Sequence, residues 1–489
     1  MPTAQPRPNI LLLMVDEMRG DCLGCAGHPD VQTPYLDTLA ARGQRFARAY
    51  SACPTCVPAR AALFTGLSPR HTGRVGYQDG VDWNYGCTMA GELAKAGYYT
   101  QCVGKMHVHP LRNYLGFHNV ELHDGYLHEA RYRDVPYGQN QLVADDYFYW
   151  LKNEQGISAD VTDSGMDCNG WTARPWPYEE RLHPTNWVAD RSIDFLRRRD
   201  PRRPFFLMSS FVRPHAPYDP PAHYFDLYDR KILRAPAAGD WDNAALLRQY
   251  GRTYNSCTGP LDPALIHAQQ AGYYGCITHI DHQIGRLLNA LTEQRILDDT
   301  VIIFTSDHGE MLSDHGFSRK SLPYEGSAHI PLIVSGPAAL VGAQNTVRQD
   351  LAELRDVMPT LLDFAGAPLP PQLDGRTLRA PLERTWLHGE HVFPFAQRSN
   401  HFIVTGRDKY IWFSETGEEQ YFDLAADPTE AHNAVAAPEN AARIAALRGY
   451  LVQDLAGRPE GFVSPGGGLI PGRPLTPCLP NATLANVEF

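Results

Sequence analysis

The sequence has 489 residues, enough for one large α/β domain with a smaller domain attached. Its 43% hydrophobic and 20% charged residues are typical of a globular protein with a sizeable core and exclude a disordered or collagen-like chain. The formal net charge of −11 gives no general attraction to polyanions, so nucleic acid is not an expected partner.

Apolar runs typical of buried strands alternate with helical stretches along most of the chain. Five runs have the composition of strands, at residues 9–15, 98–103, 205–210, 300–305 and 330–335. The longest helical pattern covers residues 263–294, where apolar residues recur every three or four positions. This alternation predicts an α/β fold whose mainly parallel central sheet is sandwiched by helices.

A smaller C-terminal unit is expected after the segment 365–371, which is rich in Pro and Ala. We therefore predict a large α/β domain over residues 1–370 and a smaller α+β subdomain over residues 371–460. Within the subdomain, Gly-Arg-Asp at 406–408 is flanked by strand-like runs and predicts an antiparallel hairpin. Residues 461–489 are rich in Gly and Pro and predict an irregular tail that lies on another surface or subunit, as in a homo-oligomer.

Neither a membrane span nor a secretion signal is expected. The longest uninterrupted apolar run extends only from Ile10 to Val15, far below the roughly 20 residues that cross a bilayer. Residues 1–8 are Pro-rich and lack the pattern of a signal peptide. Ten cysteines are too few for a disulfide scaffold. These features predict a cytoplasmic protein without membrane partners, although a mature secreted form would also lack a leader.

Titratable residues follow four of the five predicted strands. In an open α/β sheet, ligands bind outside the carboxyl ends of the strands, so these residues are expected to gather in one crevice. Taken singly, each is equally well explained as a turn residue, a solvated charge or a loop cap, but together they favour a functional site. The residues are Asp16, Glu17, Lys105, His107, His215, Asp307 and His308.

The charges of this set suit a metal ion and an anion. Three carboxylates and one imidazole favour a hard divalent cation such as Ca²⁺, Mg²⁺ or Mn²⁺ over tetrahedral zinc. These donors are Asp16, Glu17, Asp307 and His308. Fixed positive charges and hydrogen-bond donors suit a tetrahedral oxyanion. They are Arg60, Lys105, His107, His215 and Lys320.

Two Cys-x-x-Cys pairs raise the alternative of a zinc or redox site. Cys22 and Cys25 are farther from Cys53 and Cys56 than is usual among the ligands of a structural zinc, and the second pair opens a helix-like run. Neither pair has the short βαβ context of a thioredoxin-like motif. Structural zinc and redox chemistry are therefore the weaker interpretations.

The segment from Cys56 to Gly66, CVPARAALFTG, carries the most specific signal. It matches a C-x-P-x-R motif with a Thr-Gly ending, and with it the sequence resembles the type I, formylglycine-dependent sulfatases of the alkaline-phosphatase superfamily. Similar segments include GKMH at 104–107, RPHAP at 213–217 and TSDHGE at 305–310. The resemblance covers residues 8–436.

The resemblance implies a sulfuric ester hydrolase, arylsulfatase-like or choline-sulfatase-like, that cleaves a small or aryl sulfate monoester. It implies that a maturation enzyme oxidises Cys56 to Cα-formylglycine, whose hydrated form is the nucleophile. The implied catalytic residues are Cys56, Arg60, Lys105, His107, His215 (general acid) and Lys320. The implied ligands of one divalent metal, Ca²⁺ before Mn²⁺ or Mg²⁺, are Asp16, Glu17, Cys56, Asp307 and His308.

Two positions depart from the common sulfatase pattern and keep alternatives open. Position 17 is Glu where many sulfatases have Asp, and position 308 is His where many have Asn. The Asp307-His308 pair is also similar to choline-sulfatases and phosphonate monoester hydrolases, so a phosphonate monoester or phosphodiester hydrolase is the second hypothesis. A silent sulfatase-like binding protein with unconverted Cys56 is the third, and the intact acid–base residues argue against it.

The walls of the substrate pocket are less determined. The stretch 117–201 is rich in Tyr, Trp, His and Asp and is expected to contribute to them. His388 and His391 are candidate substrate contacts, with packing as the alternative. His279 and His282 are interpreted as packed polar residues of the long helix, not as ligands.

Overall fold

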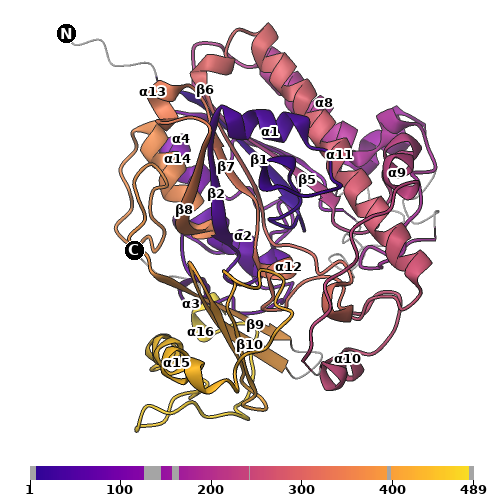
Figure 1. Cartoon of the computed structure of the whole chain (residues 1–489). Coiled ribbons are helices and arrows are strands. Elements are labelled where there is room, and N and C mark those ends of the chain that lie inside the picture. The colour runs from indigo at the N-terminus through magenta and orange to yellow at the C-terminus, as the bar shows by residue number, and fades with distance from the viewer. Residues whose placement is uncertain (1–6, 126–144, 157–164, 242, 394–397, 484–489) are drawn as a thin grey trace.

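The computed structural model describes residues 7–125, 145–156, 165–241, 243–393 and 398–483, which form two sheets (Figure 1). The strands of the larger sheet are β1 (Asn9–Asp16), β2 (Gly43–Tyr50), β3 (Tyr99–Gly104), β4 (Asn119–Leu122), β5 (Phe205–Pro214), β6 (Thr300–Ser306), β7 (Leu332–Ser335) and β8 (Thr346–Glu353). Their spatial order is β4-β3-β5-β1-β6-β7-β2-β8.

The large sheet is mainly parallel, as predicted. Only β7 runs against its neighbours β6 and β2, and the remaining pairs are parallel. The pattern of apolar runs did not predict β2, β4 and β8. Strands β4 and β8 lie at the edges of the sheet, and β2 and β8 are only partly buried. Most of their half-exposed positions hold polar residues, which removes the continuous apolar run typical of a central parallel strand.

Helices cover both faces of the large sheet (Figure 1). Alternate residues of a strand point to opposite faces, and in β1 Leu11 and Leu13 join one core cluster while Leu12 and Met14 join another. The first cluster includes residues of α1 (Pro34–Ala41), α8 (Pro184–Arg198) and α11 (Pro263–Glu293). The second includes residues of α2 (Cys56–Thr65), α4 (Met89–Lys95) and α14 (Val357–Ala365). Among the described residues, no helix is both long and apolar enough to cross a bilayer.

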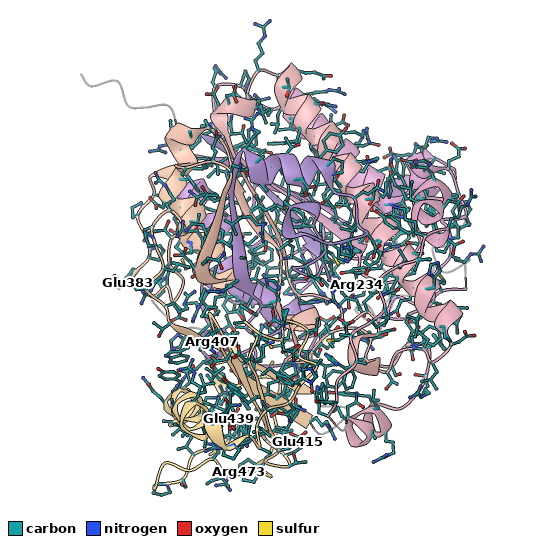
Figure 2. All side chains as sticks on the ribbon, in the orientation of Figure 1. Arg234, Glu383, Arg407, Glu415, Glu439 and Arg473 are labelled. Atoms are coloured by element: carbon teal, nitrogen blue, oxygen red, sulfur yellow. The ribbon has the colours of Figure 1, made fainter. Side chains whose placement is uncertain are left out.

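The smaller sheet is antiparallel and belongs to the C-terminal part of the chain. Its strands are β9 (Trp386–Phe393), β10 (Arg398–Thr405), β11 (Lys409–Phe413) and β12 (Glu419–Phe422). The register Val404↔Lys409 closes the predicted hairpin around residues 406–408. One face packs on α15 (Ala441–Leu455), and the other packs on Tyr50, Met311 and Tyr324 of the large unit. Exposed charged side chains, among them Arg407, Glu439 and Arg473, cover the outside of this unit (Figure 2).

The described part of the C-terminal tail lies on its own chain. The amide of Val75 donates to the carbonyl of Pro477 at 3.0 Å, and the amide of Leu479 donates to that of Gly73 at 2.7 Å. The backbone of Cys478 forms an isolated antiparallel β-bridge with that of Arg74, and α16 (Pro480–Thr483) follows. The tail therefore covers the segment after α2, and its Phe462 packs on the second sheet.

A buried ionic cluster joins the small sheet to the large unit. The Nζ of Lys409, which has no exposed surface, lies 2.7 Å from Glu325 Oε1 and 2.8 Å from Glu430 Oε1. Glu325 begins α12 (Glu325–Ala328), and its amide donates to Glu430 Oε2 at 2.7 Å. Burial raises the pKa of Glu430 to about 7, although Lys409 opposes the rise. The cluster thus depends on one cation for two carboxylates.

We expect Lys409→Met to lower the free energy of unfolding by about 3–5 kcal/mol, because it leaves buried carboxylates without their cation. Urea denaturation at neutral pH would measure the change. Lys95→Met is the control, since Lys95 is exposed and pairs with Glu92 on its own helix, and its expected effect is at most about 0.5 kcal/mol. Equal effects of the two substitutions would contradict a stabilising role for the cluster.

Candidate active site

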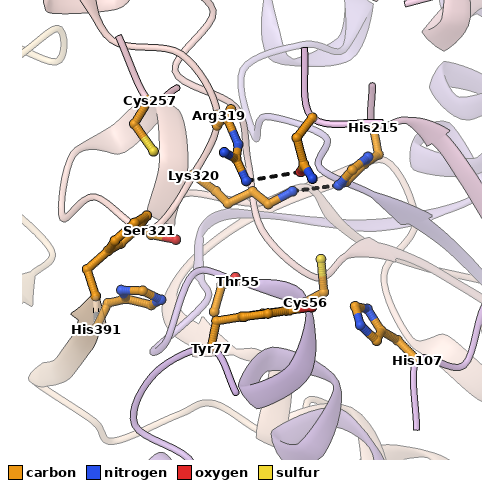
Figure 3. Close-up of a pocket in the computed structure, with 12 residues that line it drawn as sticks. Thr55, Cys56, Tyr77, His107, His215, Cys257, Arg319, Lys320, Ser321 and His391 are labelled. Atoms are coloured by element: carbon orange, nitrogen blue, oxygen red, sulfur yellow. Dashed lines mark hydrogen bonds between the residues drawn. The ribbon is translucent and has the colours of Figure 1, made fainter. Parts of the chain in front are cut away.

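The titratable residues that follow the strands of the large sheet meet at one edge of that sheet. Strands β1, β3, β5 and β6 are neighbours, and their carboxyl ends carry the residues singled out from the sequence. Beside them opens a pocket of about 260 Å³ (Figure 3). Its lining residues are Thr55, Cys56, Tyr77, His107, Asn169, His215, Cys257, Arg319, Lys320, Ser321, His391 and Phe393.

Cys56 is the first residue of α2, where the free amides of a helix N-terminus favour negative charge. The side chain is buried, and its Sγ lies 3.7 Å from Asp16 Oδ1 and 3.3 Å from His308 Nε2. The Nζ of Lys105 is 3.9 Å from the same sulfur. Position 56 is therefore surrounded by groups that stabilise an anion or bind a cation.

Arg60 lies one turn along α2 and is fully buried. Its Nε donates to Asp307 Oδ2 at 2.9 Å, and its Nη1 donates to the Lys105 carbonyl at 2.8 Å and to Ser210 Oγ at 3.2 Å. Burial lowers the pKa of the guanidinium, but Asp307 and then Asp16 raise it, and the net shift is upward. Arg60 thus joins the ends of β3, β5 and β6 and remains charged.

Lys105 follows β3, and its Nζ is in close contact with Asp16 Oδ2. Burial alone would raise the pKa of Asp16, but Lys105, His215 and Arg60 together lower it well below its usual range. The carboxylate is therefore ionised, and its partner ammonium stays protonated because Asp16 raises the pKa of Lys105 against the effect of burial.

His107 is 99% buried, and neither ring nitrogen has a hydrogen-bond partner among the described residues. Its Nε2 lies 3.8 Å from Asp79 Oδ2. The backbone at His107 has φ = +56°, a conformation that non-glycine residues rarely adopt. Its amide and that of Met106 both donate to Asp124 Oδ1 at 2.9 Å, which holds this turn in place.

A second compact cluster near the pocket consists of Lys320, His215 and Glu17. The Nζ of Lys320 lies 2.6 Å from His215 Nε2 and 2.9 Å from Glu17 Oε2 (Figure 3 shows the first contact). The Nδ1 of His215 lies 2.9 Å from the Ala216 carbonyl and donates to it, so Nε2 accepts from Lys320. Burial and then Lys320 lower the pKa of His215, whereas burial raises the pKa of Glu17 to about 8.

Two groups of side chains have the arrangement of metal ligands, and they share Asp16. In each group, one donor atom per residue lies within 4.8 Å of the others. The first group is Asp16, Cys56, Asp307 and His308, and the second is Asp16, Glu17 and His215. The sequence placed Glu17 with the first group; its carboxylate lies in the second, beside Lys320 and His215, and its ligation of the metal stays a prediction.

The first group fits a divalent cation by the orientation of its imidazole. The Nδ1 of His308 lies 3.0 Å from the Gly309 carbonyl and donates to it, which leaves Nε2 as the acceptor. That atom lies 3.5 Å from Asp16 Oδ1 and 3.7 Å from Asp307 Oδ1. Anionic oxygens and a neutral imidazole nitrogen thus converge on one point, as a metal requires.

The structure also shows where the residues of the remaining sequence hypotheses lie, namely the two Cys-x-x-Cys pairs and the other histidines. Of the cysteines in the two Cys-x-x-Cys pairs, only Cys56 belongs to a metal-compatible group among the described residues. His391 lines the pocket, but His388 instead lies 3.1 Å from Asp454 Oδ2 and 3.2 Å from His401. His279 Nε2 lies 2.7 Å from Asn186 Oδ1, in keeping with a packed polar residue.

Several lining residues were not found from the sequence. They are Thr55, Tyr77, Asn169, Cys257, Arg319, Ser321 and Phe393. Thr55, Arg319 and Ser321 adjoin predicted site residues, which is a usable signal, whereas the others come from loops or from the second sheet. Asn169 belongs to the expected wall 117–201, of which residues 126–144 and 157–164 lie outside the described residues.

Comparisons with known proteins agree with the resemblance. A family model described as sulfatase matches residues 8–367, and one described as N-sulphoglucosamine sulphohydrolase, C-terminal, matches residues 313–456. An arylsulfatase of Clostridium perfringens is 50% identical over 96% of this chain and 98% of its own. A choline-sulfatase of Rhizobium meliloti is 30% identical over 91% and 85%. The phosphonate monoester hydrolase of Agrobacterium radiobacter superposes with a TM-score of 0.73 at 26% identity, covering 91% of this chain and 95% of that one.

The four-residue group predicts a metal-dependent gain in stability. Ca²⁺ added to metal-free protein at about 100 times its dissociation constant should raise the free energy of unfolding by about 2.7 kcal/mol. Asp307→Asn should remove most of this gain, because it deletes an anionic ligand. Asp281→Asn is the control, since that buried carboxylate accepts hydrogen bonds from the amides of Tyr35 and Leu36 at the N-terminus of α1 and belongs to neither metal-compatible group. Thermal unfolding would measure the gain, and an Asp307→Asn protein that responds like wild type would disprove the ligand assignment.

Proposed function

The chain belongs to the sulfatase family, and from this premise we propose how its site performs the reaction. The chain is a sulfuric ester hydrolase. We propose that its substrate is the sulfate monoester of a small or aryl alcohol, and that the nucleophile is formed at Cys56 by a maturation enzyme that oxidises this residue to Cα-formylglycine. The observation that carries the proposal is the buried position of Cys56 at a helix N-terminus. There it belongs to a metal-compatible group and lies near Lys105 and Lys320.

Two groups beyond the encoded side chains would supply part of the chemistry. Formylglycine at position 56 would supply an oxygen nucleophile as its hydrate; departure of sulfate would return the aldehyde, which a water molecule would hydrate again. A divalent cation, Ca²⁺ as the first candidate, would increase the acidity of that nucleophile and attract the sulfate oxygens. Asp16, position 56, Asp307 and His308 would hold it.

The basic residues bind and orient the sulfate group. Lys105, directly after β3, and Lys320, in the loop before α12, offer fixed positive charge to the sulfate oxygens near position 56. Arg60 contacts both carboxylates: its Nε lies 2.9 Å from Asp307 Oδ2 and its Nη2 lies 3.8 Å from Asp16 Oδ2, and Nη2 is buried without a hydrogen-bond partner among the described residues. Its role is to position these two ligands and to add positive charge beneath position 56.

Two histidines move protons on opposite walls. We assign the general acid to His215, whose Nε2 accepts a hydrogen bond from the Lys320 ammonium, takes up that proton and passes it to the oxygen of the departing alcohol. Glu17, hydrogen-bonded to the same ammonium, keeps Lys320 in place. His107 has no competing hydrogen bond on its ring, and it would accept the proton whose removal releases sulfate.

The domain division follows the same proposal. Residues 1–370 form the catalytic domain, residues 371–460 form the smaller subdomain, and residues 461–489 form the tail. The subdomain is more than an appendage, because His391 and Phe393 of β9 line the pocket.

The nucleophile can be tested before any substrate is chosen. Conversion of Cys56 to formylglycine lowers the mass of its peptide by about 18 Da, which peptide mass spectrometry of protein from its native cell would detect. Cys56→Ala should lower kcat/KM for an aryl sulfate by at least about 1000-fold, because the nucleophile is lost. Cys53→Ala, in the same Cys-x-x-Cys pair, should retain activity. Unmodified Cys56 in fully active protein would refute the proposed nucleophile.

A phosphonate monoester hydrolase is the second candidate, favoured by the Asp307-His308 pair and by the similar fold of the Agrobacterium enzyme. Sulfate and phosphonate monoesters share a tetrahedral centre and a single negative charge. The measurement is kcat/KM for 4-nitrophenyl sulfate and for 4-nitrophenyl phenylphosphonate, which have the same leaving group. We expect the sulfate to be favoured by at least about tenfold, since both Lys105 and His107 are present, as in sulfatases. The reverse preference would select the second candidate.

A further inference from the structure

His391 is a buried imidazole of the second sheet that faces the pocket. The side chain is 99% buried, and neither ring nitrogen has a hydrogen-bond partner among the described residues. Buried polar groups in proteins are nearly always hydrogen-bonded. His391 nevertheless lines the cavity that contains Cys56, and Figure 3 shows its ring near Thr55 and Ser321. A molecule in that cavity is therefore the available partner.

The backbone of His391 is held on both sides by the catalytic domain. The amide of Glu390 donates to the carbonyl of Ala52 at 2.7 Å, and the amide of Val392 donates to that of Val75 at 2.9 Å. Ala52 lies in the loop that leads to Cys56, and Val75 comes just before Tyr77 of the pocket wall. The position of His391 relative to the nucleophile is thus fixed by main-chain contacts.

The side chain of His391 points to the opposite face of β9 from the side chains of residues 390 and 392. Side chains two residues apart share a face of a strand, so Phe393 lies on the same face as His391, with ring centroids 5.5 Å apart. Glu390 points the other way and pairs with Arg458 at 3.0 Å. Asn400, opposite His391 in register, donates to the carbonyl of Ser321 at 3.0 Å, which ties β10 to the residue after Lys320.

The chemistry of the subsite is neutral and aromatic. Burial and then His308 lower the pKa of His391 to about 3, so the imidazole is uncharged and has one donor and one acceptor. Such a ring complements a hydroxyl group, which also donates and accepts, and it offers no charge to an anion. Phe393 and Tyr77 add aromatic surface to the same pocket.

We propose that His391 is a specificity-determining residue that hydrogen-bonds a second hydroxyl group on the leaving alcohol, so that the pocket selects aryl sulfates that carry a further hydroxyl. This inference rests on the proposed sulfatase function and narrows its substrate class. His391 does not act on the ester itself; it contacts the part of the substrate that departs.

The test compares phenyl sulfate with the three hydroxyphenyl sulfate isomers. Matured wild type should show kcat/KM at least about tenfold higher for one isomer than for phenyl sulfate. His391→Phe should remove this preference, so that kcat/KM falls at least about tenfold more for the favoured isomer than for phenyl sulfate, because only the favoured isomer makes the distal hydrogen bond. His391→Asn, whose amide keeps a donor and an acceptor, should retain part of the preference. His388→Phe is the control on the same strand and should retain all of it.

Calorimetric binding separates this inference from the proposed function. In Cys56→Ala protein, which cannot turn over, the favoured isomer should bind at least about tenfold more tightly than phenyl sulfate, and adding His391→Phe should abolish the difference. If this binding preference is found but matured wild type turns over none of the esters, the subsite is retained and the proposed sulfatase function is rejected. Equal binding of all four esters would overturn the subsite, and so would a preference that survives His391→Phe. The subsite would also be overturned if His391→Phe lowered kcat/KM equally for every ester while the thermal midpoint of the protein stayed unchanged.

Discussion

The structure depends on the mutual compensation of buried charges at one edge of the large sheet. Asp16, Arg60, Lys105 and Asp307 have almost no exposed surface, and charges removed from water are stable only when they are paired and hydrogen-bonded. Arg60 pairs with Asp307, and Lys105 with Asp16. Because the four residues come from the ends of three strands and one helix, none can be compensated until the sheet and α2 are assembled.

Backbone strain accompanies this arrangement. Glu17, His107, Arg319 and Ser321 all have positive φ, between 56° and 77°, although none is glycine. Such conformations persist only where surrounding contacts impose them, and they are concentrated at functional sites. Here each residue lies in or next to the pocket or to the Lys320 cluster. The strained turns bring side chains to the pocket that a regular strand or helix would direct elsewhere.

The second sheet adds residues to the pocket from outside the eight-stranded sheet. Lys409 binds Glu325, a few residues beyond Lys320, and Asn400 binds the carbonyl of Ser321, so two strands of that sheet hold the segment that carries the second lysine. The same sheet supplies His391 and Phe393 to the pocket wall. One antiparallel unit therefore supplies part of the pocket wall and also holds the segment that carries Lys320.

The sequence by itself determined the fold class, the central strands, the long helix and the hairpin, because buried parallel strands and amphipathic helices leave local periodic patterns. It also indicated Cys56, Arg60, Lys105, His107, His215, Asp307, His308 and Lys320, since residues that follow parallel strands share one edge and the motif around Cys56 is distinctive. It did not reveal the half-exposed strands β2, β4 and β8. Only the tertiary structure decided that Glu17 faces Lys320, that His391 and not His388 reaches the pocket, and that the tail lies on its own chain. These outcomes depend on contacts between segments far apart in the chain and on which face a strand presents, and no local pattern encodes either.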